Sequence, residues 1–130
     1  MQCSEIFKSA LRLLNEKGAE DECADYAERA PYLLAAMVSE AAQLDKRYRA
    51  ANGEEAQPSF SPVFIGLDSG FPLTDRFVSA AAFYLASMLI IDDNDELSDS
   101  LYEKFCDRMA SLSSKAPAVP AELHKTKNVY

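Results

Sequence analysis

The stretch from Phe77 to Ile91 reads FVSAAAFYLASMLII and is apolar on almost every side. A helix that lacks a polar face must be surrounded by other elements. The stretch is too short to cross a bilayer, which takes about 20 apolar residues, and it is interrupted by Ser79 and Ser87. It therefore predicts the central helix of a small helical domain rather than a membrane anchor.

Two helices are predicted before this central one. Ser4 is a suitable N-cap for a first helix over residues 5–17, which Gly18 ends. An apolar stripe at three- and four-residue steps predicts a long second helix over residues 21–51, which the pair Asn52-Gly53 ends. The stripe consists of Tyr26, Ala30, Leu33, Leu34, Met37, Ala41, Leu44 and Tyr48.

Pro31 interrupts the second helix because it lacks the amide hydrogen that would bond to the carbonyl of Ala27. Two structures satisfy this constraint. One is a single helix that kinks at Pro31, and the other is a short helix abutting a longer one that begins near Ala30. We expect the kinked helix.

The central helix has a clear start and a clear end. Thr74 is expected to act as its N-cap, with Asp75 in the first turn. The acidic run over residues 92–96 is expected to end it and to begin another helix, because carboxylates are favourable at a helix start. That final helix carries one narrow apolar face, formed by Leu97, Leu101, Phe105, Met109 and Leu112.

The predicted fold class is therefore all-α: a bundle of four main helices around the central apolar one. A length of 130 residues suits a single domain, which we place at residues 1–115. Pro117 and Pro120 break any further helix, and the polar remainder has little to bury. Residues 116–130 are predicted to form a flexible C-terminal tail.

Residues 53–73 form a long irregular loop between the second and the central helix. Three prolines and two glycines in its later part forbid a long helix, yet the loop is rich in apolar side chains. Residues 63–67 are a possible short strand. The apolar side chains either pack back across the helices as an internal lid or contact a neighbouring subunit, in the way that exposed apolar patches serve assembly.

Charge and cysteine content exclude several classes of function. A formal net charge of -8 opposes generic attraction to phosphate backbones and to anionic lipids, so we expect no sequence-specific nucleic acid partner and no membrane partner. The three cysteines form no CxxC pair and are odd in number. This argues against a disulfide framework and a zinc site, and we interpret the cysteines as helix-packing residues in a reducing compartment.

No catalytic, cofactor-binding or metal site is expected. Asp92, Asn94 and Glu96 alternate as in a calcium loop, with Glu103 at the twelfth position, but Leu97 stands where such a loop needs glycine. We interpret the run as an acidic helix-capping turn. The sole histidine, at position 124, lies in the tail without a fixed partner.

The passage FPLTDRFVSAAAFYLASMLIIDDNDELSDSLYEKF resembles a recurrent phage pattern: a "PL-x-[DE]-R-F" entry, an "AL-x-Y-x-LA-x-LL" helix, an acidic turn and an amphipathic helix with "LY-x-x-[FY]". The opening FKSALRLLNEKG is similar to the "A-L-x-L-L-x-E" first helix of the same group. In layout the resemblance spans residues 4–112, and residues 72–91 match as a motif. The chain thus resembles the head-to-tail connector or adaptor proteins of tailed phages and prophages.

This resemblance implies a non-enzymatic structural protein that assembles as a ring beneath the portal. Its expected partners are portal or tail-completion proteins and further copies of itself, in the host cytoplasm and in the virion. Pro31 and the long loop have no counterpart in the family pattern, which leaves the docking surface open. The candidate partner contacts are Phe60, Val63, Phe64, Ile65, Leu67 and Phe71 in the loop and Val119, Leu123 and Tyr130 in the tail.

Two alternatives to this assignment stay open. The first is a bacterial protein-interaction or regulatory helical module, in which the loop grips a peptide or another helical protein. The second is an enzyme that depends on a metal held by Asp92, Asn94 and Glu103.

Overall fold

The computed structural model describes residues 1–14, 20–55 and 61–117, and for residues 20–23 it describes the backbone alone. The elements are α1 (Cys3–Leu13), α2 (Glu20–Ala51), the short 3₁₀ helix η1 (Asp75–Phe77), α3 (Val78–Ile90) and α4 (Asp95–Lys115). The described residues contain four α-helices and no strand, so the predicted all-α class is confirmed. Residues 63–67 do not form the possible short strand.

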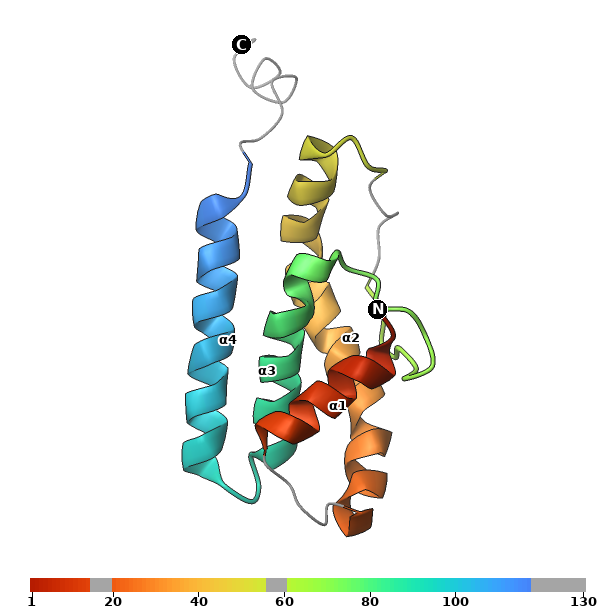
Figure 1. The fold of residues 1–130 in the computed structure, drawn as a ribbon, viewed down its shortest axis with the longest axis vertical. Coiled ribbons are helices and arrows are strands. Elements are labelled where there is room, and N and C mark those ends of the chain that lie inside the picture. The colour runs from red at the N-terminus through yellow and green to blue at the C-terminus, as the bar shows by residue number, and fades with distance from the viewer. Residues whose placement is uncertain (15–19, 56–60, 118–130) are drawn as a thin grey trace.

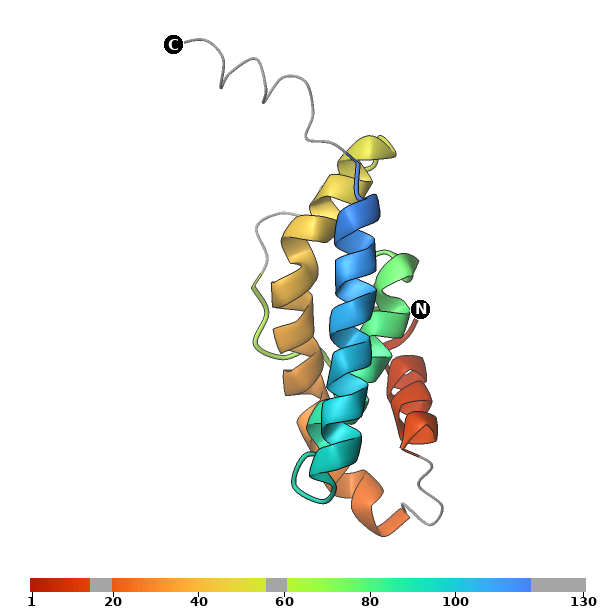
Figure 2. The same cartoon turned by 90° about the vertical axis from the view of Figure 1, so that its left-hand side faces the viewer.

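The apolar helix α3 is the centre of the bundle. It contacts α1, α2 and α4, and Figures 1 and 2 show it between α2 and α4, with α1 lying across it. Leu85 and Leu89 have no exposed surface. No described helix is both long enough and apolar enough to span a membrane. The other buried residues of α3 are Ala80, Ala81, Ala82, Ala86, Ser87 and Ile90.

The predicted stripe of α2 faces the core, where each of its members is buried or partly buried. Pro31 lies inside this single helix, and Figure 2 shows that α2 is curved rather than straight. The helix ends at Ala51, and Gly53 follows with a φ of 72°, as the Asn52-Gly53 pair predicted. The amides of Gly53 and Glu54 donate to the carbonyls of Ala50 and Arg49, which is the bonding of a glycine-terminated helix end.

One predicted N-cap is wrong, and the other is right in position but makes no capping bond. Helix α1 begins at Cys3 with Gln2 in the N-cap position, so Ser4 lies inside it. The amides of Cys3 and Ser4 donate instead to carbonyls of the long loop, at Ser69 (2.9 Å) and Leu67 (2.8 Å). Thr74 does precede η1, but its side chain makes no cap. Tertiary contacts thus replace the local caps.

The turn between α3 and α4 is a helix cap, as predicted. The side chain of Asn94 accepts a hydrogen bond from the amide of Leu97 at 3.0 Å and begins α4. Further along, the hydroxyl of Ser87 donates to the carbonyl of Ser98 and the hydroxyl of Ser98 donates to the carbonyl of Ser87, each at 2.9 Å. This reciprocal pair satisfies two buried hydroxyls and ties α3 to α4.

Candidate docking surface

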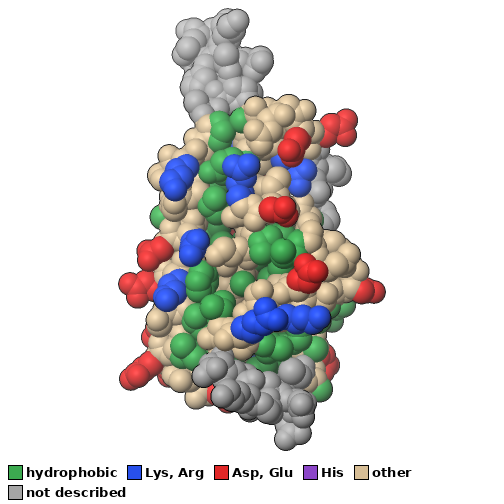
Figure 3. Space-filling view, viewed as in Figure 1, with side chains coloured by type: hydrophobic (Ala, Val, Ile, Leu, Met, Phe, Trp, Pro, Cys, Tyr) green, Lys and Arg blue, Asp and Glu red, His purple; other side chains and the backbone are tan. Residues whose placement is uncertain are grey.

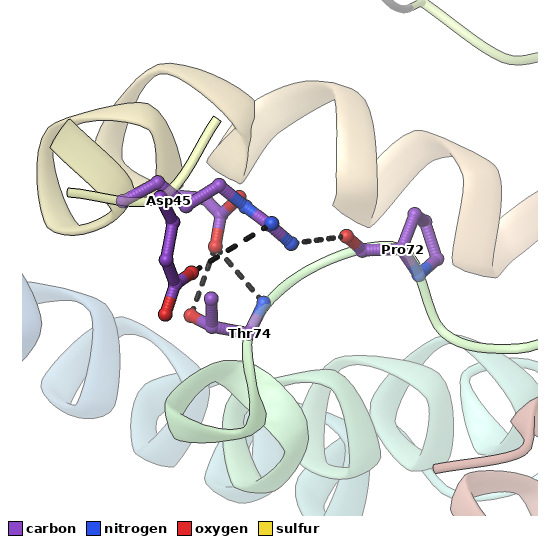
Figure 4. A network of polar contacts seen from close by, with 5 residues as sticks. Asp45, Pro72 and Thr74 are labelled. Atoms are coloured by element: carbon purple, nitrogen blue, oxygen red, sulfur yellow. Dashed lines mark hydrogen bonds and ion pairs between the residues drawn. The ribbon is translucent and has the colours of Figure 1, made fainter. Parts of the chain in front are cut away.

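The long loop is tied to α2 by a polar network around Asp45, a carboxylate that is 3% exposed. One oxygen of Asp45 accepts both the amide and the hydroxyl of Thr74 at 2.9 Å. The other accepts from Nε of Arg49 at 2.7 Å, and the same guanidinium donates to the carbonyl of Pro72 at 2.9 Å (Figure 4). Charge-assisted bonds of this kind are the stronger ones, so they hold this end of the loop firmly.

The same loop is tied to the start of α1. The amide of Phe71 donates to the carbonyl of Met1 at 2.7 Å, and Gln2 and Gly70 form an isolated antiparallel bridge. Together with the amides of Cys3 and Ser4, these bonds join the N-terminal end of the chain to the loop. In Figure 1 the green loop accordingly lies beside the N-terminus.

The middle of the loop is held by its own backbone and by two apolar anchors. The amide of Ile65 donates to the carbonyl of Pro31 at 3.1 Å, and the amide of Ser69 closes a turn to the carbonyl of Gly66 at 3.0 Å. Ile65 and Phe71 are buried in the core, and Leu67 is packed against it. These three candidate contacts therefore serve internal packing in this structure rather than an exposed surface.

Two other candidate contacts lie on the outside of the loop. Val63 is 77% exposed and Phe64 is 54% exposed. The ring of Phe64 meets the ring of Tyr32 edge to face, with 5.1 Å between their centroids, and Tyr32 is itself 55% exposed. We call these three side chains the Tyr32–Phe64 patch. Because backbone hydrogen bonds hold the loop from Ile65 onward, the patch is held in place from its C-terminal side.

Tyr32 was missed by the sequence analysis, although one signal pointed to it. It is an aromatic residue of α2 that lies outside the buried stripe, and it directly follows Pro31. Of the remaining candidate contacts, Phe60, Val119, Leu123 and Tyr130 lie outside the described residues.

The part of the chain that the structure describes contains no group of three His, Cys, Asp or Glu side chains that could hold a metal ion. Asp92 and Asn94 lie in the turn before α4, and Glu103 lies on α4 itself. Desolvation raises the pKa of the buried Cys3 thiol, which lowers its reactivity. Cys106 is exposed, so the prediction that all three cysteines pack between helices is wrong at this position.

Two grooves accompany the patch among the described residues. One of about 570 Å³ lies between α2 and α4, over an apolar floor that includes Leu44, Phe105 and Met109. The other, of about 310 Å³, lies between α1 and α3. Arg47 borders the first groove, and its guanidinium donates to the carbonyl of Pro117 at 2.8 Å.

Comparison of the chain with protein-family models, with curated proteins and with solved structures finds no match. A proposal for its function therefore rests on the sequence pattern of residues 72–91 and on the surfaces described above.

Proposed function

We propose that the chain is a non-enzymatic structural protein of a tailed phage or prophage that acts in head-to-tail connection, as an adaptor ring at the portal. The resemblance of residues 72–91 to connector proteins suggests this role. The observation that carries it is the exposed Tyr32–Phe64 patch on an anchored loop. Exposed aromatic and aliphatic side chains of this kind are typical contacts between proteins.

The way in which the patch is held supports a docking role. Flexible loops lose binding free energy when a partner orders them. Here the bonds from Asp45, Pro31 and Met1 already fix the backbone that follows Phe64. A partner that covers the patch therefore gains apolar burial without first ordering this segment.

Mixing the purified chain with portal assemblies encoded by the same genome tests the proposal. We expect co-sedimentation of the wild-type chain with the portal, and at least about tenfold weaker binding when Val63→Asp is combined with Phe64→Ser. Tyr102→Ser is the matched control, since it removes a 41% exposed aromatic from α4. Circular dichroism of each variant verifies that it is folded.

Two results would contradict this proposal. A wild-type chain that binds neither portal nor tail-completion proteins excludes the adaptor role. If Tyr102→Ser weakens portal binding and the combined Val63→Asp and Phe64→Ser variant does not, the portal docks on another surface.

The same patch also favours the second candidate, a protein-interaction or regulatory module of a bacterium, because its apolar chemistry suits any partner with a complementary groove. The neighbouring genes separate the two candidates. Portal and major capsid genes beside this one support the adaptor, and their absence there favours the module.

A further inference from the structure

The groove between α1 and α3 has an apolar floor and lies apart from the Tyr32–Phe64 patch. Val78, Ala82 and Phe83 of α3 line it on one side, and Leu13 of α1 lines it on the other. Leu13 is 36% exposed and Phe83 is partly buried. The central helix is thus not fully covered by its own chain along this stripe.

Cations surround this floor. Arg12 lines the groove from α1. From α4, Lys104 and Arg108 reach over the ring of Phe83, at 6.0 and 5.5 Å from its centroid. Figure 3 shows the result as a band of hydrophobic side chains with Lys and Arg side chains on both sides. We call this surface the basic groove.

The three cations of the basic groove make no ion pair with any described residue. Lys104 and Arg108 are four positions apart and share one face of α4. Glu103 is one position before Lys104, about 100° around the helix. Asp107 is one position before Arg108 and three after Lys104, yet it makes no ion pair with either cation. The rim is therefore positively charged in a chain whose formal net charge is -8, and no described carboxylate is paired with it.

The turn between α3 and α4 carries the opposite chemistry. Ile91 is 44% exposed there, and it is followed by the exposed acids Asp92, Asp93, Asp95 and Glu96. Figures 1 and 2 place this turn at one end of the molecule. We call residues 91–96 the acidic tip. The acidic tip presents an apolar side chain beside carboxylates, and the basic groove presents an apolar floor beside cations, so the two surfaces are complementary in charge.

We propose that the basic groove of one copy receives the acidic tip of a second copy. Ile91 would cover the apolar floor, and the carboxylates would pair with Arg12, Lys104 and Arg108. Because groove and tip are different surfaces, this contact is heterologous: a pair of copies retains one free groove and one free tip. Further copies therefore add, and they form a ring where the rotation between copies closes. The inference rests on the self-assembly in the proposed function and names the surfaces that produce it.

Charge reversal on each surface tests the contact by sedimentation velocity of the full chain at low and high salt. We expect the wild-type mass to rise with concentration and to fall with added salt. Arg12→Glu with Arg108→Glu, and separately Asp92→Lys with Glu96→Lys, should each raise the concentration of half-association at least about tenfold. Combining all four substitutions in one chain should restore association. Lys46→Glu with Lys115→Glu is the matched control, since both lysines are exposed outside the groove.

Three outcomes overturn the inference. Association that survives both reversals shows that copies join through other surfaces, and it leaves the proposed adaptor ring intact. If either reversal abolishes association and the combined variant does not restore it, direct pairing of groove and tip is excluded. A chain that stays monomeric at every concentration excludes the contact. The adaptor role is then tested separately, by the binding of the chain to portal assemblies.

Discussion

Asp45 on α2 accepts both the amide and the hydroxyl of Thr74 through a single carboxylate oxygen, at 2.9 Å each. Thr74, which was expected to cap the central helix with its own side chain, is instead held by a residue 29 positions earlier in the chain. This contact fixes where the long loop ends and where α3 begins, so it positions the loop that carries the Tyr32–Phe64 patch.

Removal of the Asp45 carboxylate should destabilise the fold. Asp45→Ala deprives Thr74 of its acceptor and leaves the largely buried Arg49 with only its longer ion pair, to Glu54, at a cost of about 3 kcal/mol. Asp45→Asn should cost less because the amide oxygen still accepts from Thr74. Urea unfolding followed by circular dichroism measures both, and an Ala variant as stable as wild type would contradict the structural role given to this network.

The buried hydroxyl of Ser87 should be required for close contact between α3 and α4. Ser87→Ala loses the bond to the carbonyl of Ser98 and is expected to cost about 1 kcal/mol. Ser87→Val adds volume where the two helices meet and should cost about 1–3 kcal/mol. Ser100→Ala, at an exposed site on α4, is the neutral control. Equal thermal midpoints for Ser87→Ala and Ser100→Ala would show that the hydrogen bonds between Ser87 and Ser98 contribute nothing to stability.

A side chain at Gly53, after the end of α2, should destabilise the fold. Its φ of 72° is strained for alanine although the space beside it is open, so Gly53→Ala should lower the free energy of unfolding by about 1 kcal/mol. Gly70→Ala is the matched control, because a Cβ there also meets no atom within 4 Å and no positive φ is involved. Chemical denaturation of the two variants separates backbone strain from crowding.

Thiol reactivity should distinguish the two cysteines whose side chains are described. In a Cys23→Ser variant at pH 8, Cys106 should react rapidly with a disulfide reagent, because it is exposed. Cys3 should react on the order of 100-fold more slowly, because it is buried and because desolvation raises the pKa of its thiol and so depletes the reactive thiolate. Equally fast modification of both thiols in the native state would place Cys3 at the surface.

The raised pKa of Cys3 also has a consequence for stability. In the unfolded chain the thiol ionises near the ordinary value of 9.0, whereas in the folded chain it stays protonated to a higher pH. The contribution of this group is therefore complete below pH 9 and is lost as pH rises beyond it. Cys3→Ser should reduce the loss of stability that accompanies a rise in pH above 9.0, measured by urea unfolding.

The candidate surface was only partly predictable. The apolar excess of the long loop drew attention to Val63 and Phe64, which are exposed, but it drew equal attention to Ile65 and Phe71, which are buried. Composition gives no means of separating them, because the orientation of a side chain in an irregular loop depends on which backbone groups the helices hold. Here the amides of the two buried residues are held, Ile65 by the carbonyl of Pro31 and Phe71 by the carbonyl of Met1.

The sequence by itself determined the helices and their buried faces. A stripe of apolar residues at helical spacing, a capping side chain at Asn94 and a glycine at position 53 are local features, and each acts within a few residues along the chain. Only the tertiary structure decided how the loop lies and how Thr74 and Ser4 are satisfied, because those bonds join groups far apart in sequence. The apolar floor and the cations of the basic groove likewise come from α1, α3 and α4 together, and no one segment contains that pattern.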